Sequence, residues 1–264
     1  MKTIYLHNKE IIESFLRRDI YLHLYSLGDL DDFYWQYTQW FALSENEIIL
    51  SLVLLYTGLE MPTLLALDSS DNIENLRRLF NSIVHLLPGK FHLHISPGLT
   101  DTLSEEYILK PRGEHYKMAL KNPQAINKID TSRVDKLGID ERNNLLKLYK
   151  MSYPGHWFDP RMLETGQYYG IRESCELVSV AGIHVFSPEY RVAALGNITT
   201  RPDYRGKGYG KAVTAKLCES LLQSVSYIGL NVKSDNMPAI KCYKDLGFEI
   251  ISSFEEYIVK KIRI

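Results

Sequence analysis

The sequence predicts an α/β (α+β) fold in which a mixed, mostly antiparallel sheet is flanked by helices. Two pairs of apolar, β-branched runs carry this prediction, one pair at 47–56 and 61–67 and the other at 176–187 and 190–199. The two runs of each pair are separated by a short turn that contains glycine or proline, which is typical of β-hairpins. A helical pattern and a further strand follow each hairpin, so the same order of elements occurs twice along the chain.

The other elements of the first half follow from residue spacing. Apolar residues three and four positions apart predict helices around 11–16 and over 73–84. Residues 90–96 alternate apolar side chains with histidines, which predicts a half-buried strand. The first half is therefore expected to contain a helix, a hairpin, a second helix and a third strand.

The second half repeats this order with different residues. Helices are expected around 140–149, over 208–223 and over 237–246, and strands over 227–232 and 248–260. No sequence repeat between the halves is visible, so the proposed relation between them rests on the order of elements.

The pattern is interrupted at Asn122-Pro123, which sets the expected domain boundary. The two domains are then 1–125 and 126–264. A chain of 264 residues is long enough to give each of them a core of ordinary size.

Composition excludes several classes of protein. A formal net charge of -1 disfavours duplex nucleic acid as a partner, because proteins that bind its phosphates usually carry strongly basic surfaces. The three cysteines form no CxxC pair, which indicates a reducing compartment and no metal site. The apolar runs are too short to span a bilayer, and the N-terminus lacks the apolar core of a signal peptide. The expected location is the cytoplasm, without a membrane partner.

The segment Arg205-Gly206-Lys207-Gly208-Tyr209-Gly210 predicts a phosphate site. Three glycines alternate just where a helix should begin, and glycine lets the backbone approach a ligand closely. A helix N-terminus offers unpaired N–H groups and a positive dipole end, which together suit a pyrophosphate. A Walker A loop is excluded because Arg205 occupies its first glycine position, and a dinucleotide fingerprint because Lys211 occupies its third.

Two segments around this loop resemble motifs of one family. Residues 200–210, TRPDYRGKGYG, look like motif A of the GNAT superfamily of N-acetyltransferases. Residues 236–248, NMPAIKCYKDLGF, resemble motif B of that family and follow at the usual distance. The layout of the whole chain looks like that of tandem GNAT relatives such as glycine N-acyltransferase-like and FR47-like proteins. The resemblance implies a GNAT fold in two tandem halves, of which the second is catalytic.

The resemblance also implies the cofactor site. Acetyl-CoA would bind along a strand whose backbone holds the pantetheine arm and polarises the thioester carbonyl. Backbone N–H groups of the glycine loop would hold the pyrophosphate, and the start of the motif B helix would contact the cofactor. The residues concerned are Ile198, Thr199, Thr200, Arg205, Gly206, Lys207, Gly208, Tyr209, Gly210, Lys211, Asn236 and Tyr243.

The implied reaction is direct attack of a primary amine on the thioester. Tyr243 would protonate the departing thiolate, which a phenol with a pKa of about 10 can do while un-ionised at neutral pH. A base or a water chain should deprotonate the amine; His184 is the first candidate and Glu173 the second. Packing roles remain the alternative for both Tyr243 and His184.

The acceptor site is expected in an aromatic, irregular segment after the helix around 140–149. Its candidate residues are Tyr153, His156, Trp157, Phe158 and Tyr168. A surface loop held by aromatic packing is an equally good interpretation. The acceptor would be an amine of a small molecule or a peptide, and its identity does not follow from the sequence. The sequence does not determine the oligomeric state; a homodimer is one assembly compatible with it.

The first half lacks an equivalent glycine loop. Its corresponding turn at 67–72 contains acidic and amide side chains and no glycine, and acidic side chains repel a pyrophosphate. We therefore expect a degenerate GNAT-like domain that packs on the catalytic one. Three alternatives stay open for the whole chain: a non-catalytic acyl-CoA sensor, an acyltransferase for longer acyl-CoA, and a nucleotide-binding regulator.

Overall fold

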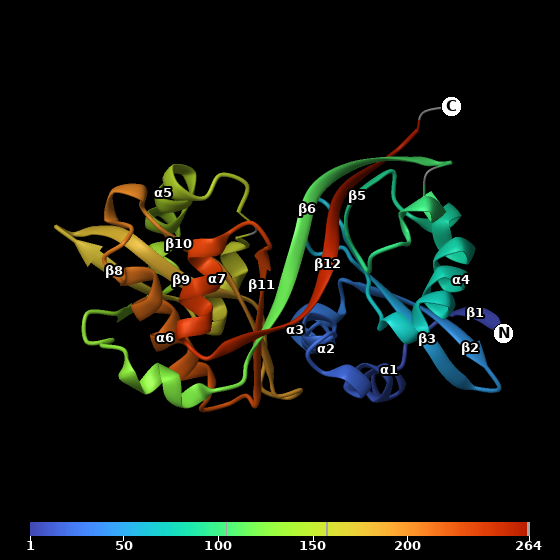
Figure 1. Cartoon of the computed structure of the whole chain (residues 1–264), viewed down its shortest axis with the longest axis horizontal. Coiled ribbons are helices and arrows are strands. Elements are labelled where there is room, and N and C mark those ends of the chain that lie inside the picture. The colour runs from blue at the N-terminus through green and yellow to red at the C-terminus, as the bar shows by residue number, and fades with distance from the viewer. Residues whose placement is uncertain (104, 157, 263–264) are drawn as a thin grey trace. The chain divides into compact units, whose positions relative to one another are not determined.

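The computed structural model describes residues 1–103, 105–156 and 158–262, and these form two compact units (Figure 1). Unit 1 comprises Met1–Lys117 and Ile251–Ile264, and unit 2 comprises Met118–Ile250. The chain passes from unit 1 to unit 2 within strand β6 (Tyr107–Leu120) and returns to unit 1 within strand β12 (Phe248–Lys261). Strand β12, the last of the chain, therefore belongs largely to unit 1, although its position in the sequence would assign it to the second half.

Unit 1 is a mixed sheet with helices. Its strand order is β1-β2-β3-β4-β5-β12-β6. Strands β1 to β4 pair antiparallel, β4 pairs parallel with β5, and β5 pairs antiparallel with β12. The strands are β1 (Lys2–Tyr5), β2 (Thr38–Glu45), β3 (Ile48–Tyr56), β4 (Thr63–Ala66), β5 (Lys90–Ile95), β6 (Tyr107–Leu120) and β12 (Phe248–Lys261), and the helices are α1 (Lys9–Leu16), α2 (Leu24–Gly28), α3 (Asp32–Trp35) and α4 (Ile73–Ile83).

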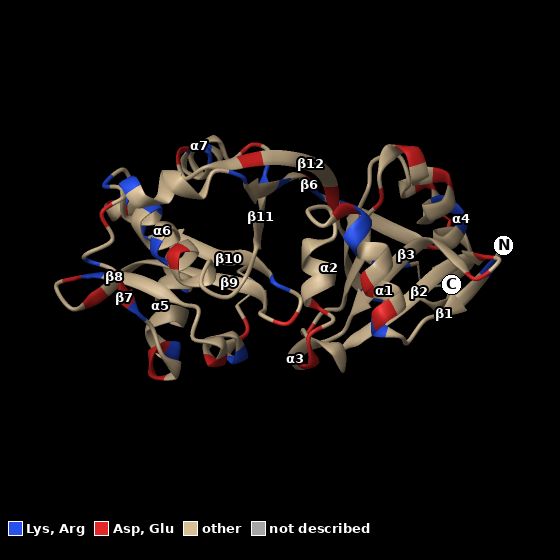
Figure 2. Ribbon diagram, turned by 90° about the horizontal axis from the view of Figure 1, so that it is seen from below, with Lys and Arg blue, Asp and Glu red and all other residues tan. Residues whose placement is uncertain are grey.

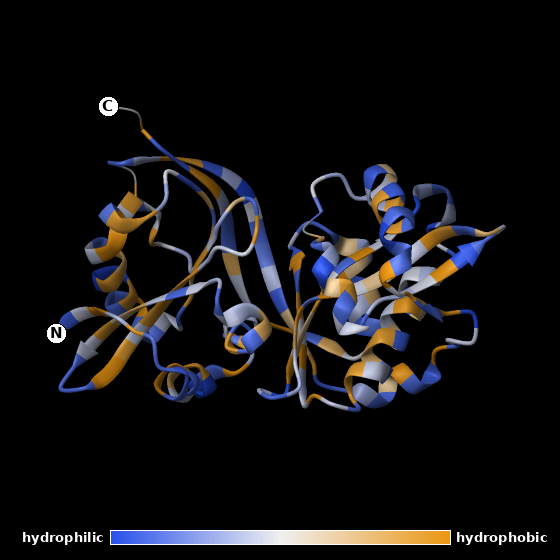
Figure 3. Ribbon diagram, turned by 180° about the vertical axis from the view of Figure 1, so that it is seen from behind, coloured by the Kyte–Doolittle hydropathy of each residue, from blue (hydrophilic) through white to orange (hydrophobic). Residues whose placement is uncertain are grey.

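Helix α4 shows why the sequence folds in this way. Its apolar residues recur at helical spacing, so Leu76, Leu79, Phe80 and Ile83 lie on one face and are buried. They pack in a core with apolar side chains of the neighbouring strands. Figure 3 shows the alternation as orange and blue segments along helices and strands. The helices predicted around 11–16 and over 73–84 and the strand predicted over 90–96 are all present.

Unit 2 is also a mixed, mostly antiparallel sheet, and the predicted fold class is confirmed. The order is β11-β10-β9-β8-β7, with antiparallel pairs except for the parallel pair β10–β11. Helices α5 and α6 pack against β9. The elements are β7 (Asp135–Lys136), β8 (Tyr169–Glu173), β9 (Glu176–Ser187), β10 (Val192–Thr200), β11 (Tyr227–Lys233), α5 (Arg142–Ser152), α6 (Tyr209–Leu221) and α7 (Met237–Asp245).

Unit 1 contains a buried lysine on β6. Lys117 is 3% exposed, and its Nζ lies 5.1 Å from the ring centre of Tyr25 and 5.4 Å from that of Phe254. In the described part of the chain Nζ forms no ion pair. Burial lowers the pKa of Lys117 to about 7, against a smaller raising effect of Asp19. Aromatic faces alone do not replace the hydration of a buried ammonium group.

Replacing Lys117 by methionine is expected to stabilise the protein by on the order of 3 kcal/mol at pH 7. The folded-state pKa lies below the unfolded one, so between pH 7 and about 10.5 the unfolded state binds more protons and wild-type stability rises with pH. The advantage of methionine should therefore be largest below pH 7 and vanish towards pH 10.5. Urea unfolding at several pH values measures this.

The exposed Lys110 on the same strand provides the control. Lys110→Met should change the free energy of unfolding by less than about 0.5 kcal/mol at any pH. A loss of stability in Lys117→Met at pH 7 would contradict the argument, because it would mean that the buried ammonium group has a stabilising partner.

Candidate functional site

The glycine loop leads directly into α6. Gly208 is the N-cap residue with φ of 83°, and Gly206 has φ of 77°. A Cβ at either position would meet nothing within 4 Å, so the left-handed backbone, and not crowding, favours glycine there. No described side chain caps the helix. The N–H groups of its first turn are therefore available to an anion.

Basic residues occur in the loop before α6 and in its first turn, and Figure 2 colours the ribbon blue at such residues. Arg205 donates from Nε to the carbonyl of Thr200 at 3.1 Å, which ties the loop to the end of β10. The Nζ of Lys207 lies 4.5 Å from the ring centre of Tyr204. Arg205 and Lys207 are exposed and form no ion pair among the described residues, although the charge of Lys207 contributes to the lowered pKa of Asp203 and Glu173.

Lys211 has a different role from these two cations. Its Nζ forms an ion pair of 2.6 Å with Asp245, which lies at the end of α7. The hydrogen bond from Lys211 and its charge hold the pKa of Asp245 below its usual range. The ion pair links α6 to α7, so Lys211 can offer a phosphate its backbone N–H more readily than its ammonium group.

Glu173 also contacts the loop. Its carboxylate accepts hydrogen bonds from the hydroxyl of Tyr209, at the start of α6, and from Arg133 at 2.8 Å. These two donors, Tyr209 first, lower the pKa of Glu173. A carboxylate with two donors and a lowered pKa is well suited to hold the start of α6 and poorly suited to accept a proton. The predicted role of Glu173 as a base gains no support from this arrangement.

The end of β10 is separated from β11. The two strands pair in parallel from Val192 with Tyr227 to Leu195 with Leu230, and the register ends there. Strand β10 nevertheless continues to Thr200. Three of the predicted cofactor residues, Ile198, Thr199 and Thr200, lie in this part of β10. Their edge towards β11 can therefore bind a ligand that runs along the strand.

Two β-bulges shape the same stretch of β9 and β10. On β9, His184 is the extra residue between the pairs Ala194–Val185 and Leu195–Ile183. On β10, Asn197 and Ile198 together oppose one residue of β9. Bulges bend a strand and redirect its side chains, and they are frequent beside active sites.

The imidazole of His184 packs on the backbone of β10. A Cβ added to Gly196 would overlap this ring, so the close approach requires glycine. Burial lowers the pKa of His184 to about 4, which keeps the ring neutral at physiological pH. A neutral imidazole with so low a pKa can accept a hydrogen bond, but it holds a proton only weakly.

Helix α7 carries Asn236 and Tyr243. Asn236 is the N-cap residue, and its side chain accepts a hydrogen bond from the N–H of Ala239 at 3.3 Å. Tyr243 lies on the buried face, 9% exposed, with its ring centre 6.0 Å from that of Phe248. The neighbouring Cys242 is half-buried, and burial raises its pKa to about 11. Its thiol is therefore protonated at neutral pH and a weak nucleophile.

The aromatic segment after α5 packs inward. His156 stacks on Tyr149 with ring centres 4.8 Å apart, and its Nδ1 accepts from the N–H of Phe158 at 3.2 Å. Burial lowers the pKa of His156. Tyr168 is fully buried and donates to the carbonyl of Ile183 at 3.2 Å, which argues against direct contact with a substrate. Tyr153 and His156 are half-buried, and Trp157 lies outside the described residues.

Two residues that the sequence did not single out join these elements. Tyr149 on α5 donates to the carbonyl of Asn197 at 3.0 Å. Asn197 donates from Nδ2 to the hydroxyl of Tyr168 at 3.1 Å and has φ of 54°. An asparagine within a run of apolar and β-branched residues was the available signal, because asparagine is among the few residues that adopt positive φ readily.

The corresponding turn of unit 1 is closed by its own side chains. The carboxylate of Asp68 accepts hydrogen bonds from the N–H of Ser69 at 2.9 Å, from Ser51 at 3.0 Å and from Asn72 at 2.7 Å. The parallel pairing of β4 with β5 continues to Ala66, the last residue of β4. Unit 1 therefore lacks the open strand edge of unit 2, within the residues described. No described side chain caps α4, but the carboxylate of Asp68 lies in the turn before it, where it would repel a phosphate.

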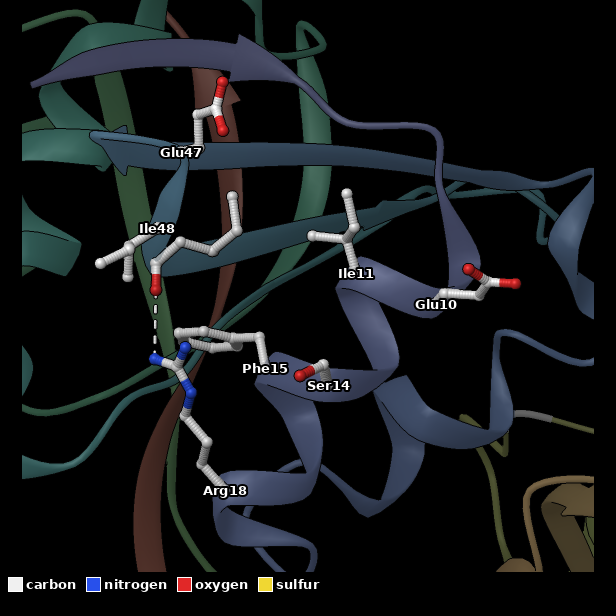
Figure 4. A pocket seen from close by; sticks show the side chains of 8 residues that line it. Glu10, Ile11, Ser14, Phe15, Arg18, Glu47 and Ile48 are labelled. Atoms are coloured by element: carbon white, nitrogen blue, oxygen red, sulfur yellow. Dashed lines mark hydrogen bonds between the residues drawn. The ribbon is translucent and has the colours of Figure 1, made fainter.

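Unit 1 has a pocket of its own, of about 350 Å³ (Figure 4). Apolar side chains of α1 and the start of β3 line it beside two glutamates, and Arg18 donates to the carbonyl of Ile49 at 3.1 Å. None of the predicted site residues borders this pocket. Within the described residues no group of three His, Cys, Asp or Glu side chains could hold a metal ion. No helix in the described part of the chain is long and apolar enough to cross a membrane.

The free start of α6 and the open edge of β10 suit an extended, phosphate-bearing cosubstrate. Residues 139–248 match the model of the acetyltransferase (GNAT) family, so the chain contains a domain of that family. The match covers the glycine loop, α6 and all of α7.

Two curated relatives resemble part of this region. Mycothiol acetyltransferase of Corynebacterium jeikeium is 46% identical over 50 residues, which cover 19% of this chain and 14% of the relative. N-acetylaspartate synthetase of Xenopus tropicalis is 32% identical over 115 residues, which cover 43% of this chain and 38% of the relative. The chain therefore matches well under half of the length of either protein.

Solved structures share the fold along the whole chain. A Drosophila protein superposes with a TM-score of 0.72 at 11% identity, covering 98% of both chains. A tandem GNAT protein from the clavulanic acid biosynthesis pathway superposes with a TM-score of 0.55 at 11% identity, also covering 98% of both chains. The GNAT fold and the expected tandem resemblance are thus confirmed at the level of the fold.

Proposed function

We propose that this protein transfers the acetyl group of acetyl-CoA to a primary amine of a small molecule or peptide. The observation that carries the proposal is the uncapped start of α6, with Gly206 and Gly208 at positive φ, beside the unpaired end of β10. The pyrophosphate of acetyl-CoA would bind the first-turn N–H groups of α6, and its pantetheine arm would run along 198–200. Unit 2 is the catalytic domain in this proposal and unit 1 a degenerate one.

The chemistry is a direct transfer. The amine nitrogen attacks the thioester carbonyl carbon, the C–N bond forms, and the C–S bond breaks as the thiolate leaves. Tyr243 donates its proton to this thiolate and afterwards regains a proton from water. The low pKa of His184 supports a role as acceptor of a hydrogen bond from the amine, with water taking up the released proton. The raised pKa of Cys242 disfavours an acyl-enzyme.

The proposal predicts binding and turnover. Calorimetry of the full chain should detect acetyl-CoA binding with one site. A panel of small amines, amino acids and short peptides should then include an acceptor that accelerates release of free CoA thiol, followed with a thiol reagent.

Replacing acetyl-CoA by longer acyl-CoA thioesters in the same assay tests the preference for acyl length. Binding without thiol release for any amine would favour a non-catalytic acyl-CoA sensor. An absence of binding at millimolar acetyl-CoA would refute the proposal.

A further inference from the structure

We infer that Tyr149 and Tyr168 are positioning residues for acyl transfer, because their buried hydroxyls hold the Asn197 bulge of β10 in the orientation that presents the strand to the thioester. The inference rests on the proposed function, since it concerns the strand assigned there to the cosubstrate. It gives two tyrosines a role at the site without contact to either substrate.

Asn197, in the β10 bulge, has an unfavourable backbone conformation close to the residue where the pairing of β10 with β11 ends. Pairing with β11 ends at Leu195, and two residues further on Asn197 has φ of 54°. Asparagine adopts positive φ more readily than most residues with a side chain, but this conformation still costs energy relative to an ordinary strand, and such residues persist where surrounding contacts fix them. Asn197 is 2% exposed, and its Oδ1 has no hydrogen-bond partner among the described residues, which adds a desolvation cost.

The contacts that fix Asn197 come from two sides. Tyr149 donates to its carbonyl oxygen at 3.0 Å, and its side-chain amide donates to the Tyr168 hydroxyl at 3.1 Å. The Tyr168 hydroxyl in turn donates to the carbonyl of Ile183 on β9 at 3.2 Å. The backbone of Asn197 is therefore held by Tyr149 and its side chain by Tyr168. The Tyr168 hydroxyl is itself bonded to the neighbouring strand β9.

The bond from Tyr149 also determines the direction of the next N–H group. In a planar trans peptide the C=O and the following N–H point in opposite directions. Since the carbonyl of Asn197 points to Tyr149 on α5, the N–H of Ile198 points away from α5. This N–H belongs to the segment assigned to the cosubstrate, and its direction depends on one hydroxyl.

The rigidity of Tyr149 comes from the aromatic segment after α5. His156 stacks on its ring at 4.8 Å, and the ring centre of Phe158 lies 5.2 Å away. Phe158 also contacts Tyr168, with ring centres 5.7 Å apart. The segment expected to bind the acceptor therefore supports both tyrosines.

The test measures the thioester carbonyl directly. Acetyl-CoA labelled with ¹³C at the carbonyl is bound to the full chain, and the C=O stretching band is recorded by isotope-edited infrared spectroscopy. Donors fixed on the carbonyl lower its frequency relative to free acetyl-CoA. In Tyr149→Phe this shift should fall to about half, and kcat should fall about tenfold, while the dissociation constant changes less than about threefold.

Tyr107→Phe is the matched control. Tyr107 is a fully buried tyrosine of unit 1 whose hydroxyl donates to the carbonyl of Leu87 at 3.1 Å. Its replacement removes a comparable hydrogen bond and should lower the melting temperature, but leave the carbonyl band unchanged. Asn197→Gly is the second variant, since glycine adopts positive φ without strain. It keeps the bond from Tyr149 but loses the bond to Tyr168, so its shift should lie between those of wild type and Tyr149→Phe. A full wild-type shift in Asn197→Gly would remove Tyr168 from the positioning role.

Each outcome decides a different claim. A band that is equally shifted in wild type and Tyr149→Phe overturns the positioning role while the proposed function stands. Wild type that binds no acetyl-CoA overturns the proposed function and this inference with it. A band that changes in Tyr107→Phe as much as in Tyr149→Phe overturns the inference, because general destabilisation would then explain the effect.

Discussion

Gly208→Glu is expected to abolish binding of acetyl-CoA at micromolar concentrations. Gly208 is the N-cap of α6, so the new carboxylate would stand where the pyrophosphate is proposed to bind. Two like charges about 4 Å apart near a protein surface repel by about 4 kcal/mol, which is roughly a thousandfold in the dissociation constant. Calorimetry of acetyl-CoA binding measures the effect.

The fold should tolerate this change. A side chain at φ of 83° is strained by about 1–2 kcal/mol, but a Cβ there meets no atom within 4 Å. A negative charge at a helix N-terminus is itself favourable by about 0.3–1 kcal/mol and offsets part of this strain. The loss of binding would therefore arise from the ligand and not from unfolding of α6.

Gly98→Glu is the matched control for Gly208→Glu. Gly98 has φ of 85° and equally open surroundings, but it lies in unit 1. The same strain and the same charge should leave binding unchanged there. Gly208→Ala separates the two effects at the site itself, since it adds the strain without the charge. Tight binding by Gly208→Glu would show that the phosphates bind elsewhere.

The parts of this molecule that the sequence predicts are those with a local cause. The glycine loop is predictable because the positive φ at positions 206 and 208 favours glycine there. Helix α6, predicted over 208–223, is observed over Tyr209–Leu221 because its apolar spacing is a property of that segment alone. The acidic turn of unit 1 is predictable for the same reason, and Asp68 closes it with three hydrogen bonds.

The parts that the sequence does not predict depend on distant partners. Strand β12 belongs to unit 1 because it pairs with β5. Alternating apolar and polar side chains predict that a segment is a strand, but they do not predict which strand it pairs with. The low pKa of His184 arises from burial, which no local pattern reports. Tyr168 is a candidate acceptor-site residue in the sequence, and its full burial and its bonds to Asn197 and Ile183 follow only from the three-dimensional structure.

Tyr243→Phe is expected to lower kcat by about 100-fold or more with the acceptor found by the amine panel. The hydroxyl is proposed to protonate the leaving thiolate, and general acid catalysis contributes about 10² to 10⁴ in rate. The ring should remain packed near Phe248, 6.0 Å away, so the dissociation constant of acetyl-CoA should change little. Thiol release at saturating substrate and calorimetry measure the two effects separately.

Cys242→Ala distinguishes this mechanism from an acyl-enzyme. Cys242 neighbours Tyr243 on α7, and burial raises its pKa to about 11, so little thiolate is available at neutral pH. Cys242→Ala should therefore retain kcat within about threefold. Full activity in Tyr243→Phe together with a large loss in Cys242→Ala would reverse the assignment, because the acetyl group would then pass through the thiol before it reaches the amine.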